Sequence, residues 1–219
     1  MRFISLSIPL ILLTTTAWGA IVGPDGVDSI VTLLDGSGIL IGQAEFGRSS
    51  KDGFDSANVS TSNTAPTGVY VQSHSGMANM NEQVDSHATL VAQQMIGTGL
   101  TGGVAEGAAL HSFSLSDQND DSLVALGLNR LALLNGGQIK AINMSFYGVP
   151  GFFDNPDGNS YTTQFVDWSA QRHDVLYVVS WGNADSLETL RKPADNFNGI
   201  TVASSEQVDD EGPYRRFSV

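Results

Sequence analysis

The sequence predicts an α/β protein in which helices cover both faces of a mostly parallel β-sheet. Short apolar runs rich in β-branched residues alternate along the chain with longer stretches of helical periodicity. Strands that alternate with helices in this way are typical of right-handed crossovers and a parallel sheet. No repeat or linker divides the chain after its first residues, which indicates one domain at residues 38–219, preceded by a lead at residues 20–37.

In the first half of the domain, the apolar run at residues 39–47 ends at an acid and a glycine. This is typical of a buried parallel strand that opens into a loop. A polar, turn-rich segment follows, and residues 68–74 form a second possible strand. Residues 87–97 have the periodicity of a helix. The apolar side of that helix is expected to contain Leu90, Val91, Met95 and Ile96.

In the second half, strands are expected at residues 108–115, 139–146, 174–183 and 199–205, with helices at residues 121–137 and 162–173. The helix at residues 121–137 is closed by glycines, which favour helix C-termini. The acidic segment Ser116–Asp121 precedes this helix. It lacks the regular ligand spacing of a calcium loop, so we interpret it as acids at an exposed helix N-terminus.

The charge balance restricts the partners of this protein. The chain has 10 Lys and Arg against 23 Asp and Glu, and its formal net charge is −13. Such a surface repels phosphate backbones and anionic lipids, which disfavours nucleic acid and membranes as partners. The chain contains no cysteine, so its stability depends on the core rather than on disulfides.

The first 19 residues are typical of a secretory signal peptide. Arg2 precedes an apolar stretch from Phe3 to Leu13, which is too short to cross a bilayer. Small residues near the end favour cleavage after Gly19, with Ala20 as the competing position. We therefore expect a secreted protein, extracellular or periplasmic, without a membrane anchor.

Four polar residues fall at the expected carboxyl ends of strands, where ligands bind in open parallel sheets. They are Glu45, Asn143, Ser145 and Asn183. At the start of the helix at residues 87–97, His87 follows two suitable N-cap residues. A histidine there can be a structural residue of a helix start, or a general base that faces a cleft.

Five sequence blocks favour the second interpretation, because they occur in the order of a known family with similar gaps. They are HATLVA at residues 87–92, GVAEGAAL at 103–110, INMSFYG at 142–148, VVSWGNAD at 178–185 and KPADNFNGITVAS at 192–204. From Gly38 to Ser218 the chain resembles the subtilisin-like serine proteases, the subtilases. The resemblance implies a three-layer subtilisin-like fold and hydrolysis of peptide bonds by acyl transfer.

By position, the resemblance gives three residues catalytic roles. His87 would be the general base, Glu45 the acid that orients its imidazole, and Asn183 the donor to the oxyanion. Glu45 departs from the family pattern, which has Asp there. Asp55 is a weaker candidate for the acid because it lies beyond the strand end. Trp181 replaces a small residue and would crowd the approach to Asn183.

The resemblance also implies a binding site for an extended peptide or protein substrate. The strand that continues through Ser145 and Phe146 to Gly148 would line the substrate pocket, and its backbone would pair with the substrate. No cofactor is implied. Structural calcium occurs in this family, but no site for it is assignable from this sequence.

The nucleophile is the main departure from the family pattern. By the family's spacing, the catalytic serine would lie beyond Val219, so we interpret the sequence as a C-terminally incomplete fragment of a subtilase. One alternative is a non-catalytic protein of the same fold that binds peptides or packs in a surface assembly. Another is a carboxyl-type serine peptidase with Glu82 and Asp85 as its acids, which the His-x-Thr-x-Val-Ala block disfavours.

Overall fold

A computed structural model of the chain describes residues 35–51, 69–71, 84–98, 103–115, 120–146, 157–182, 192–203, 205–207 and 214–216. The strands are β1 (Leu40–Glu45), β2 (Val69–Val71), β3 (Ala109–Ser114), β4 (Ala141–Met144), β5 (Leu176–Ser180), β6 (Ile200–Val202), β7 (Ser205–Gln207) and β8 (Tyr214–Arg216). The helices are α2 (Ser86–Ile96), α3 (Asp121–Ala132) and α4 (Tyr161–His173), with a 3₁₀ turn η2 (Leu134–Gly136).

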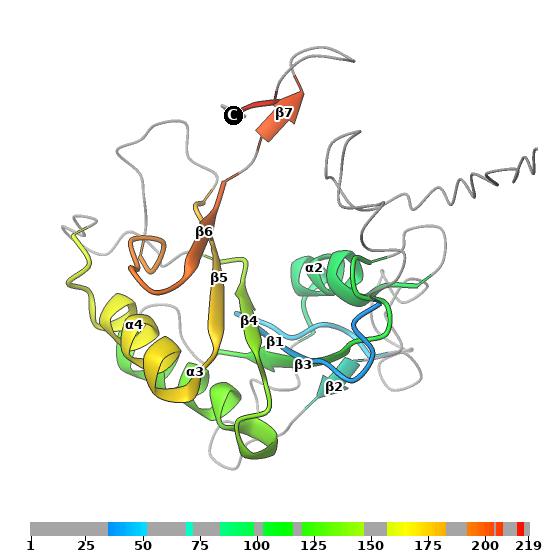
Figure 1. The fold of residues 1–219 in the computed structure, drawn as a ribbon, viewed down its shortest axis with the longest axis horizontal. Coiled ribbons are helices and arrows are strands. Elements are labelled where there is room, and N and C mark those ends of the chain that lie inside the picture. The colour runs from blue at the N-terminus through cyan, green and yellow to red at the C-terminus, as the bar shows by residue number, and fades with distance from the viewer. Residues whose placement is uncertain are drawn as a thin grey trace, which may run out of the picture.

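Six of the strands form one sheet in the order β2-β3-β1-β4-β5-β6, and all of its neighbouring strands are parallel (Figure 1). The strands β7 and β8 form a separate antiparallel pair. The parallel sheet confirms the expected α/β fold class. Central parallel strands must be buried on both faces, which is why their sequences are mainly apolar.

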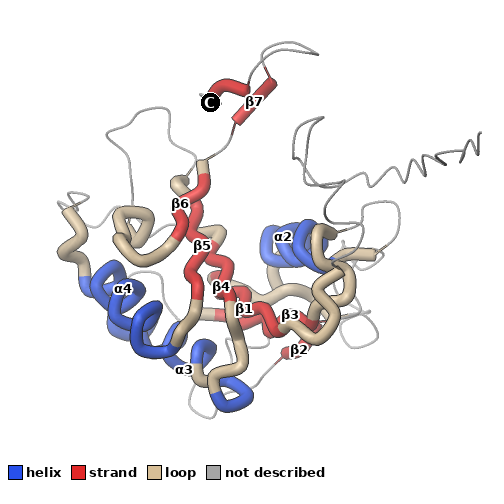
Figure 2. Tube along the Cα trace, in the orientation of Figure 1, coloured by secondary structure: helices blue, strands red, loops and turns tan. Residues whose placement is uncertain are grey.

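Helices cover both faces of the sheet, as expected for a three-layer fold. Helix α2 lies on one face, and α3 and α4 lie together on the other (Figure 2). Successive side chains of a strand point to opposite faces. In β1, Gln43 therefore points to α2, where it contacts Ala88, whereas Ala44 joins the core cluster that contains Leu128 of α3.

The larger part of the core lies between the sheet and the pair α3 and α4. It is built from strand residues such as Ile142, Met144 and Tyr177, which pack against Leu131 and Val166 of the two helices. A smaller cluster lies under α2 and contains Ala92, Ile96, Ala108 and Leu110. Strand β1 contributes to both clusters, through Ala44 to the larger and through Ile41 to the smaller, and is therefore packed on both faces.

The buried side of α2 differs from the expected one. Leu90 is 53% exposed, so its assignment to the apolar side of the helix was wrong. The buried residues of the helix are Ala88, Thr89, Ala92, Gln93 and Ile96. Alanines at this interface let the helix backbone approach the sheet closely, and the sheet meets it with polar as well as apolar side chains. Val91 and Met95 are half-buried.

In the described part of the chain, each of the helices α2, α3 and α4 begins at a side-chain cap. Asp85 accepts from the backbone N–H of Ala88 at 2.8 Å, and Ser160 accepts from that of Thr163 at 3.0 Å. Asp120 caps α3, accepting from two N–H groups of its first turn. This confirms that Asp120 and Asp121, from the acidic segment Ser116–Asp121, lie at a helix N-terminus; residues 116–119 lie outside the described residues.

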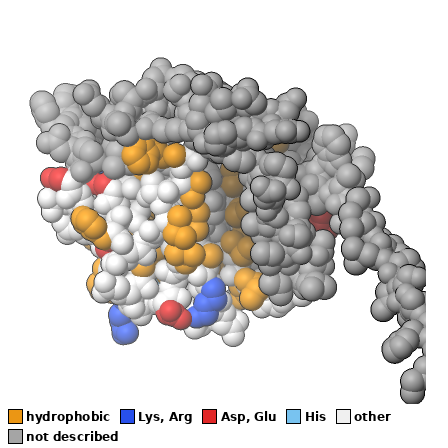
Figure 3. All heavy atoms as spheres, turned by 45° about the horizontal axis from the view of Figure 1, so that its top comes forward, with side chains coloured by type: hydrophobic (Ala, Val, Ile, Leu, Met, Phe, Trp, Pro, Cys, Tyr) orange, Lys and Arg blue, Asp and Glu red, His pale blue; other side chains and the backbone are white. Residues whose placement is uncertain are grey.

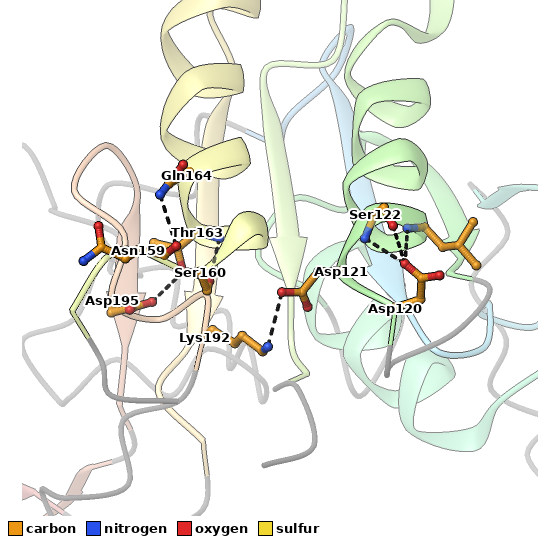
Figure 4. Close-up of polar contacts among 10 residues, drawn as sticks. Asp120, Asp121, Ser122, Asn159, Ser160, Thr163, Gln164, Lys192 and Asp195 are labelled. Carbon is orange, nitrogen blue, oxygen red and sulfur yellow. Dashed lines mark hydrogen bonds and ion pairs between the residues drawn. The ribbon is translucent and has the colours of Figure 1, made fainter. Parts of the chain in front are cut away.

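The N-terminal ends of α3 and α4 are joined to the segment that precedes β6 (Figure 4). Lys192 forms an ion pair of 3.2 Å with Asp121 of α3. Asp195 accepts from the hydroxyl of Thr163 in α4 at 2.6 Å and from the N–H of Gly158 at 2.9 Å. These contacts fix the segment against both helices.

Hydrophobic side chains gather on the face of the molecule that Figure 3 shows. In β5 and β6, the large apolar side chains of Leu176, Ile200 and Val202 are 41–50% exposed. Among the helices that the structure describes, none has both the length and the apolar character needed to cross a bilayer. The signal peptide predicted at residues 1–19 lies outside the described residues.

Candidate active site

The site lies at the carboxyl ends of two neighbouring parallel strands, β1 and β4. Their register pairs Gln43 with Asn143, which places Glu45 beside Ser145 at the next positions of the same face. Helix α2 begins over this face, because Gln43 also contacts its first turn. The topology therefore brings Glu45, Ser145 and the start of α2 to one edge of the sheet.

Glu45 is a buried acid. Its side chain is 3% exposed, and its Oε1 accepts a hydrogen bond of 3.2 Å from the backbone N–H of Ser145. Burial raises the pKa of this carboxyl from 4.5 to about 8; the Ser145 N–H opposes the rise, and the negative charge of Asp85 adds to it. The carboxyl is therefore mostly neutral at pH 7 unless a cation approaches it.

His87 is the second residue of α2, and its side chain is exposed. Its Nε2 lies 3.1 Å from the carbonyl oxygen of Ser145. Because a carbonyl can only accept, Nε2 carries the proton in this contact. In a Ser-His-acid triad, Nε2 instead receives the proton of the serine while Nδ1–H faces the acid. A catalytic role thus requires the ring to leave this carbonyl.

Ser145 joins the acid to the histidine. Its N–H donates to Glu45, its C=O accepts from His87, and its hydroxyl accepts from the side-chain amide of Asn143 at 2.9 Å. The structure thus brings Glu45 and His87 to the backbone of the same residue, on the same face of the sheet. Within the described residues no direct hydrogen bond between the two side chains is present.

The two residues that follow Glu45 and Ser145 in the chain are aromatic and join the core cluster on the opposite face of the sheet. Phe46 follows Glu45, Phe146 follows Ser145, and their rings pack edge to face with centroids 4.6 Å apart. Phe146 is 8% exposed and belongs to the core, while its carbonyl accepts from the hydroxyl of Ser180 at 3.2 Å. The side chain of Phe146 is thus structural, and only its backbone remains a candidate for contact with a substrate.

The predicted oxyanion donor, Asn183, lies outside the described residues, as do Gly148, Asp55 and Glu82. Their roles remain predictions. The chain that leads to Asn183 is described: the N–H of Trp181 donates to the carbonyl of Val202 at 2.8 Å, which continues the pairing of β5 with β6. Gly182 then has a φ of 102°, which L side chains rarely adopt.

Sequence reasoning did not identify a buried polar network beneath α2. Gln43, Ser112 and Thr89 are at most 2% exposed, and all three form hydrogen bonds. The available signal was a polar residue in the middle of the apolar run ILIGQAE. As for metals, no cluster of three or more His, Asp or Glu suited to an ion occurs in the part of the chain that the structure describes.

A cavity of about 620 Å³ lies between α3 and α4, away from this site. Its lining residues are Ser122, Ala125, Leu126, Asn129, Tyr161, Gln164, Phe165 and Trp168. None of them is charged or nucleophilically activated, and the two helices lie on the face of the sheet opposite α2. The cavity therefore cannot take part in chemistry at His87.

Comparisons with known proteins give a family and a fold. The model of the family described as the subtilase family matches residues 26–218. A comparison with curated proteins gives no match. One similar solved structure is fervidolysin from Fervidobacterium pennivorans, a keratinolytic enzyme related to subtilisin. Its TM-score is 0.57 and its identity 20%, over 86% of this chain and 27% of that one.

Two further structures have the same fold. A protease from Pseudoalteromonas arctica has a TM-score of 0.55 and 16% identity, over 86% of this chain and 63% of its own. The A-subunit of the AB5 toxin from Escherichia coli has a TM-score of 0.54 and 16% identity, over 86% of this chain and 64% of its own. The chain thus spans less than two thirds of the length of each of these three proteins.

Proposed function

Since the chain belongs to the subtilase family, we propose that it provides the acid and the base of a secreted serine endopeptidase. The observation that carries the proposal is the meeting of Glu45 and His87 at Ser145, with distances of 3.2 Å and 3.1 Å to its N–H and C=O. A buried acid at a strand end and a histidine at the start of the neighbouring helix are the two groups that an activated serine needs.

In this proposal, His87 takes the proton of a serine hydroxyl and returns it to the leaving amine, while Asn183 donates to the oxyanion. Glu45 stabilises the imidazolium that forms. Because burial raises the pKa of Glu45 to about 8, its carboxyl would first release its proton to solvent, and the resulting carboxylate would then face the imidazolium. The serine itself would lie outside residues 1–219, in keeping with the partial coverage of the similar proteins.

The substrate would be an extended stretch of peptide or protein that pairs with the backbone from Ser145 to Gly148. Before attack, the ring of His87 has to exchange the Ser145 carbonyl for the serine hydroxyl. We propose that the substrate favours this exchange by competing for backbone groups at the end of β4.

The mature protein would begin at Ala20 or Ile21, which sequencing of the N-terminus of the secreted product would test.

Activity-based labelling tests the proposed function. The reading frame would be extended past codon 219 with its natural continuation, and the product treated with a fluorophosphonate, which reacts with activated serines. We expect labelling that His87→Ala abolishes. Tyr177→Phe is the control, because it removes a buried hydrogen bond under α4 and leaves β1, β4 and α2 untouched. Labelling that persists without His87, or an extended frame without a reactive serine, would refute the proposal.

A non-catalytic peptide-binding protein of the same fold is the second candidate. Two observations favour it: Nε2 of His87 is engaged by the Ser145 carbonyl, and Glu45 makes its described hydrogen bond to backbone rather than to the histidine. This function predicts that the extended protein binds fluorescent peptides without cleaving them. Anisotropy and mass spectrometry of the same samples would separate the two functions.

A further inference from the structure

Gln43 is a polar residue in the centre of the sheet. It belongs to β1, which has β3 on one side and β4 on the other, and its side chain is completely buried. Its Nε2 donates to the carbonyl of Ala88 in α2 at 2.7 Å, and its Oε1 accepts from the hydroxyl of Ser112 in β3 at 2.8 Å. The amide thus connects the central strand to the helix and to the neighbouring strand.

The network continues into the loop that follows β1. The hydroxyl of Ser112 accepts from the N–H of Ser49 at 2.7 Å. The hydroxyl of Thr89 accepts from the N–H of Ser50 at 3.0 Å and donates to the carbonyl of Asp85 at 2.8 Å. The first turn of α2 is thus joined to β1, β3 and the loop after β1 by hydrogen bonds of ordinary length.

The backbone around His87 is held by hydrogen bonds, whereas its ring is not packed. Its side chain is exposed and its ring contact is with a single carbonyl, so packing does not fix it. Its backbone, however, lies between Asp85 and Ala88. The N–H of Asp85 donates to the carbonyl of Arg48 at 2.9 Å, and the carbonyl of Ala88 is held by Gln43. The residues on both sides of His87 are therefore anchored.

Gln43 also lies two residues before Glu45, on the same face of the same strand. That separation is about 7 Å along a strand, because each residue advances 3.2–3.4 Å. The hydrogen bond from Gln43 to Ala88 therefore fixes the first turn of α2, which carries His87, at a short distance from Glu45, because only two residues of regular strand separate Gln43 from Glu45. An apolar side chain would fill this space but would not define a direction of approach, whereas a hydrogen-bonded amide does.

We propose that Gln43 is a positioning residue, which sets the place of the first turn of α2 and thereby holds His87 at the edge where Glu45 and Ser145 meet. The inference deepens the proposed function, because a base within reach of its acid is useful only if His87 acts in catalysis. The positioning itself can be measured in the chain of 219 residues, without a serine or any activity.

The decisive variant is Gln43→Met, which keeps an unbranched side chain of similar length and removes both hydrogen bonds. NMR would follow the imidazole nitrogens of His87 and the hydrogen exchange of the N–H groups of Ala88 and Thr89, with His87→Gln to assign the ring signals. We expect exchange of these two N–H groups to increase about tenfold. We also expect the Nε2–H form of His87 to lose its preference over the other tautomer.

Tyr177→Phe is the matched control. It removes a buried hydrogen bond of 2.8 Å to Ser169 on the other face of the sheet, far from α2. It should change the signals of His87 and the exchange of the first turn less than twofold. Equal effects of Tyr177→Phe and Gln43→Met, or unchanged His87 signals in Gln43→Met, would overturn the inference.

If Gln43→Met does not fold, Ser112→Ala decides, because it removes one partner of the amide and leaves Gln43 bonded to α2. It should also increase the hydrogen exchange of the N–H groups of Ala88 and Thr89, by a smaller factor, and no change would refute the network's role.

In the extended protein, Gln43→Met should lower kcat about 100-fold with KM unchanged. An inactive extended wild type would refute the proposed function, and the NMR result would still decide the role of Gln43.

Discussion

Replacement of Glu45 by glutamine tests the physical basis of the site, because it substitutes a neutral isostere for a buried acid. The pKa of Glu45 is raised from 4.5 to about 8 in the folded chain, chiefly by burial. The folded state therefore binds this proton more tightly than the unfolded state. The stabilisation is complete below pH 4.5 and is lost as the pH rises through about 8.

The magnitude follows from the two pKa values. Between pH 5.5 and pH 8.5, the wild-type chain should lose roughly 3 kcal/mol of unfolding free energy through this group alone. That is a large part of the total stability of a domain, which is typically about 5–15 kcal/mol. Glu45→Gln cannot ionise and still accepts from the N–H of Ser145, so its stability should be nearly constant over the same range.

The assay is urea unfolding followed by tryptophan fluorescence at several pH values between 5.5 and 8.5. Glu106→Gln is the matched control, because it makes the same chemical change at an exposed position and should retain the pH dependence of the wild type. If wild type and Glu45→Gln lose stability in parallel over this range, the carboxyl of Glu45 does not titrate there, and the account of the site as a desolvated acid fails.

Two further substitutions test the packing that supports the site, both by urea unfolding. A Cβ added to Gly127 of α3 would lie 2.7 Å from Cδ2 of Leu115, so Gly127→Ala should lower the stability by about 1–3 kcal/mol despite the better helix propensity of alanine; a more stable variant would contradict this packing. Lys192→Met leaves the partly buried Asp121 without its 3.2 Å ion pair and should cost about 1–2 kcal/mol. The equally short but exposed surface pair of Lys140 is the control, and Lys140→Met should cost less than about 0.5 kcal/mol; equal losses would refute the role of burial.

The parallel sheet could be predicted from the sequence because its signals are local. The run that ends at Glu45 and the run around Ile142 are mainly apolar, interrupted by Gln43 and Asn143, and both are central strands in the structure. Helix starts were equally accessible, since Asp85 and Asp120 are cap residues that precede apolar periodicity.

The buried side of α2 could not be predicted from periodicity alone. Leu90 is more hydrophobic than Ala88, yet Ala88 is buried and Leu90 is exposed. The sheet beneath the helix carries Gln43, which is bonded to Ser112 and donates to the helix backbone at Ala88, so that a small residue is needed above it. This requirement comes from the sheet that the helix packs against, so the sequence of the helix alone does not reveal it.

The candidate site was predictable as far as the backbone determines it. Parallel strand ends meet at one edge, so the proximity of Glu45 and Ser145 followed from their positions in two strands. The partners of their side chains did not follow. That Glu45 binds the N–H of Ser145 and His87 its carbonyl depends on rotamers, and no sequence pattern encodes those.

The replacement of the family's Asp by Glu45 and the burial of this acid together couple the ionisation of Glu45 to the position of His87. The longer side chain of Glu45 reaches across to the backbone N–H of Ser145, just after β4, and is only 3% exposed there. An ionised carboxylate is unfavourable at this buried position when it has no partner. It becomes favourable when an imidazolium faces it, since the attraction between the two charges then offsets their loss of hydration. The ionisation of Glu45 and the release of His87 from the Ser145 carbonyl should therefore occur together. In the resting state of the folded chain at neutral pH, Glu45 is therefore mostly protonated and His87 is bound to the Ser145 carbonyl.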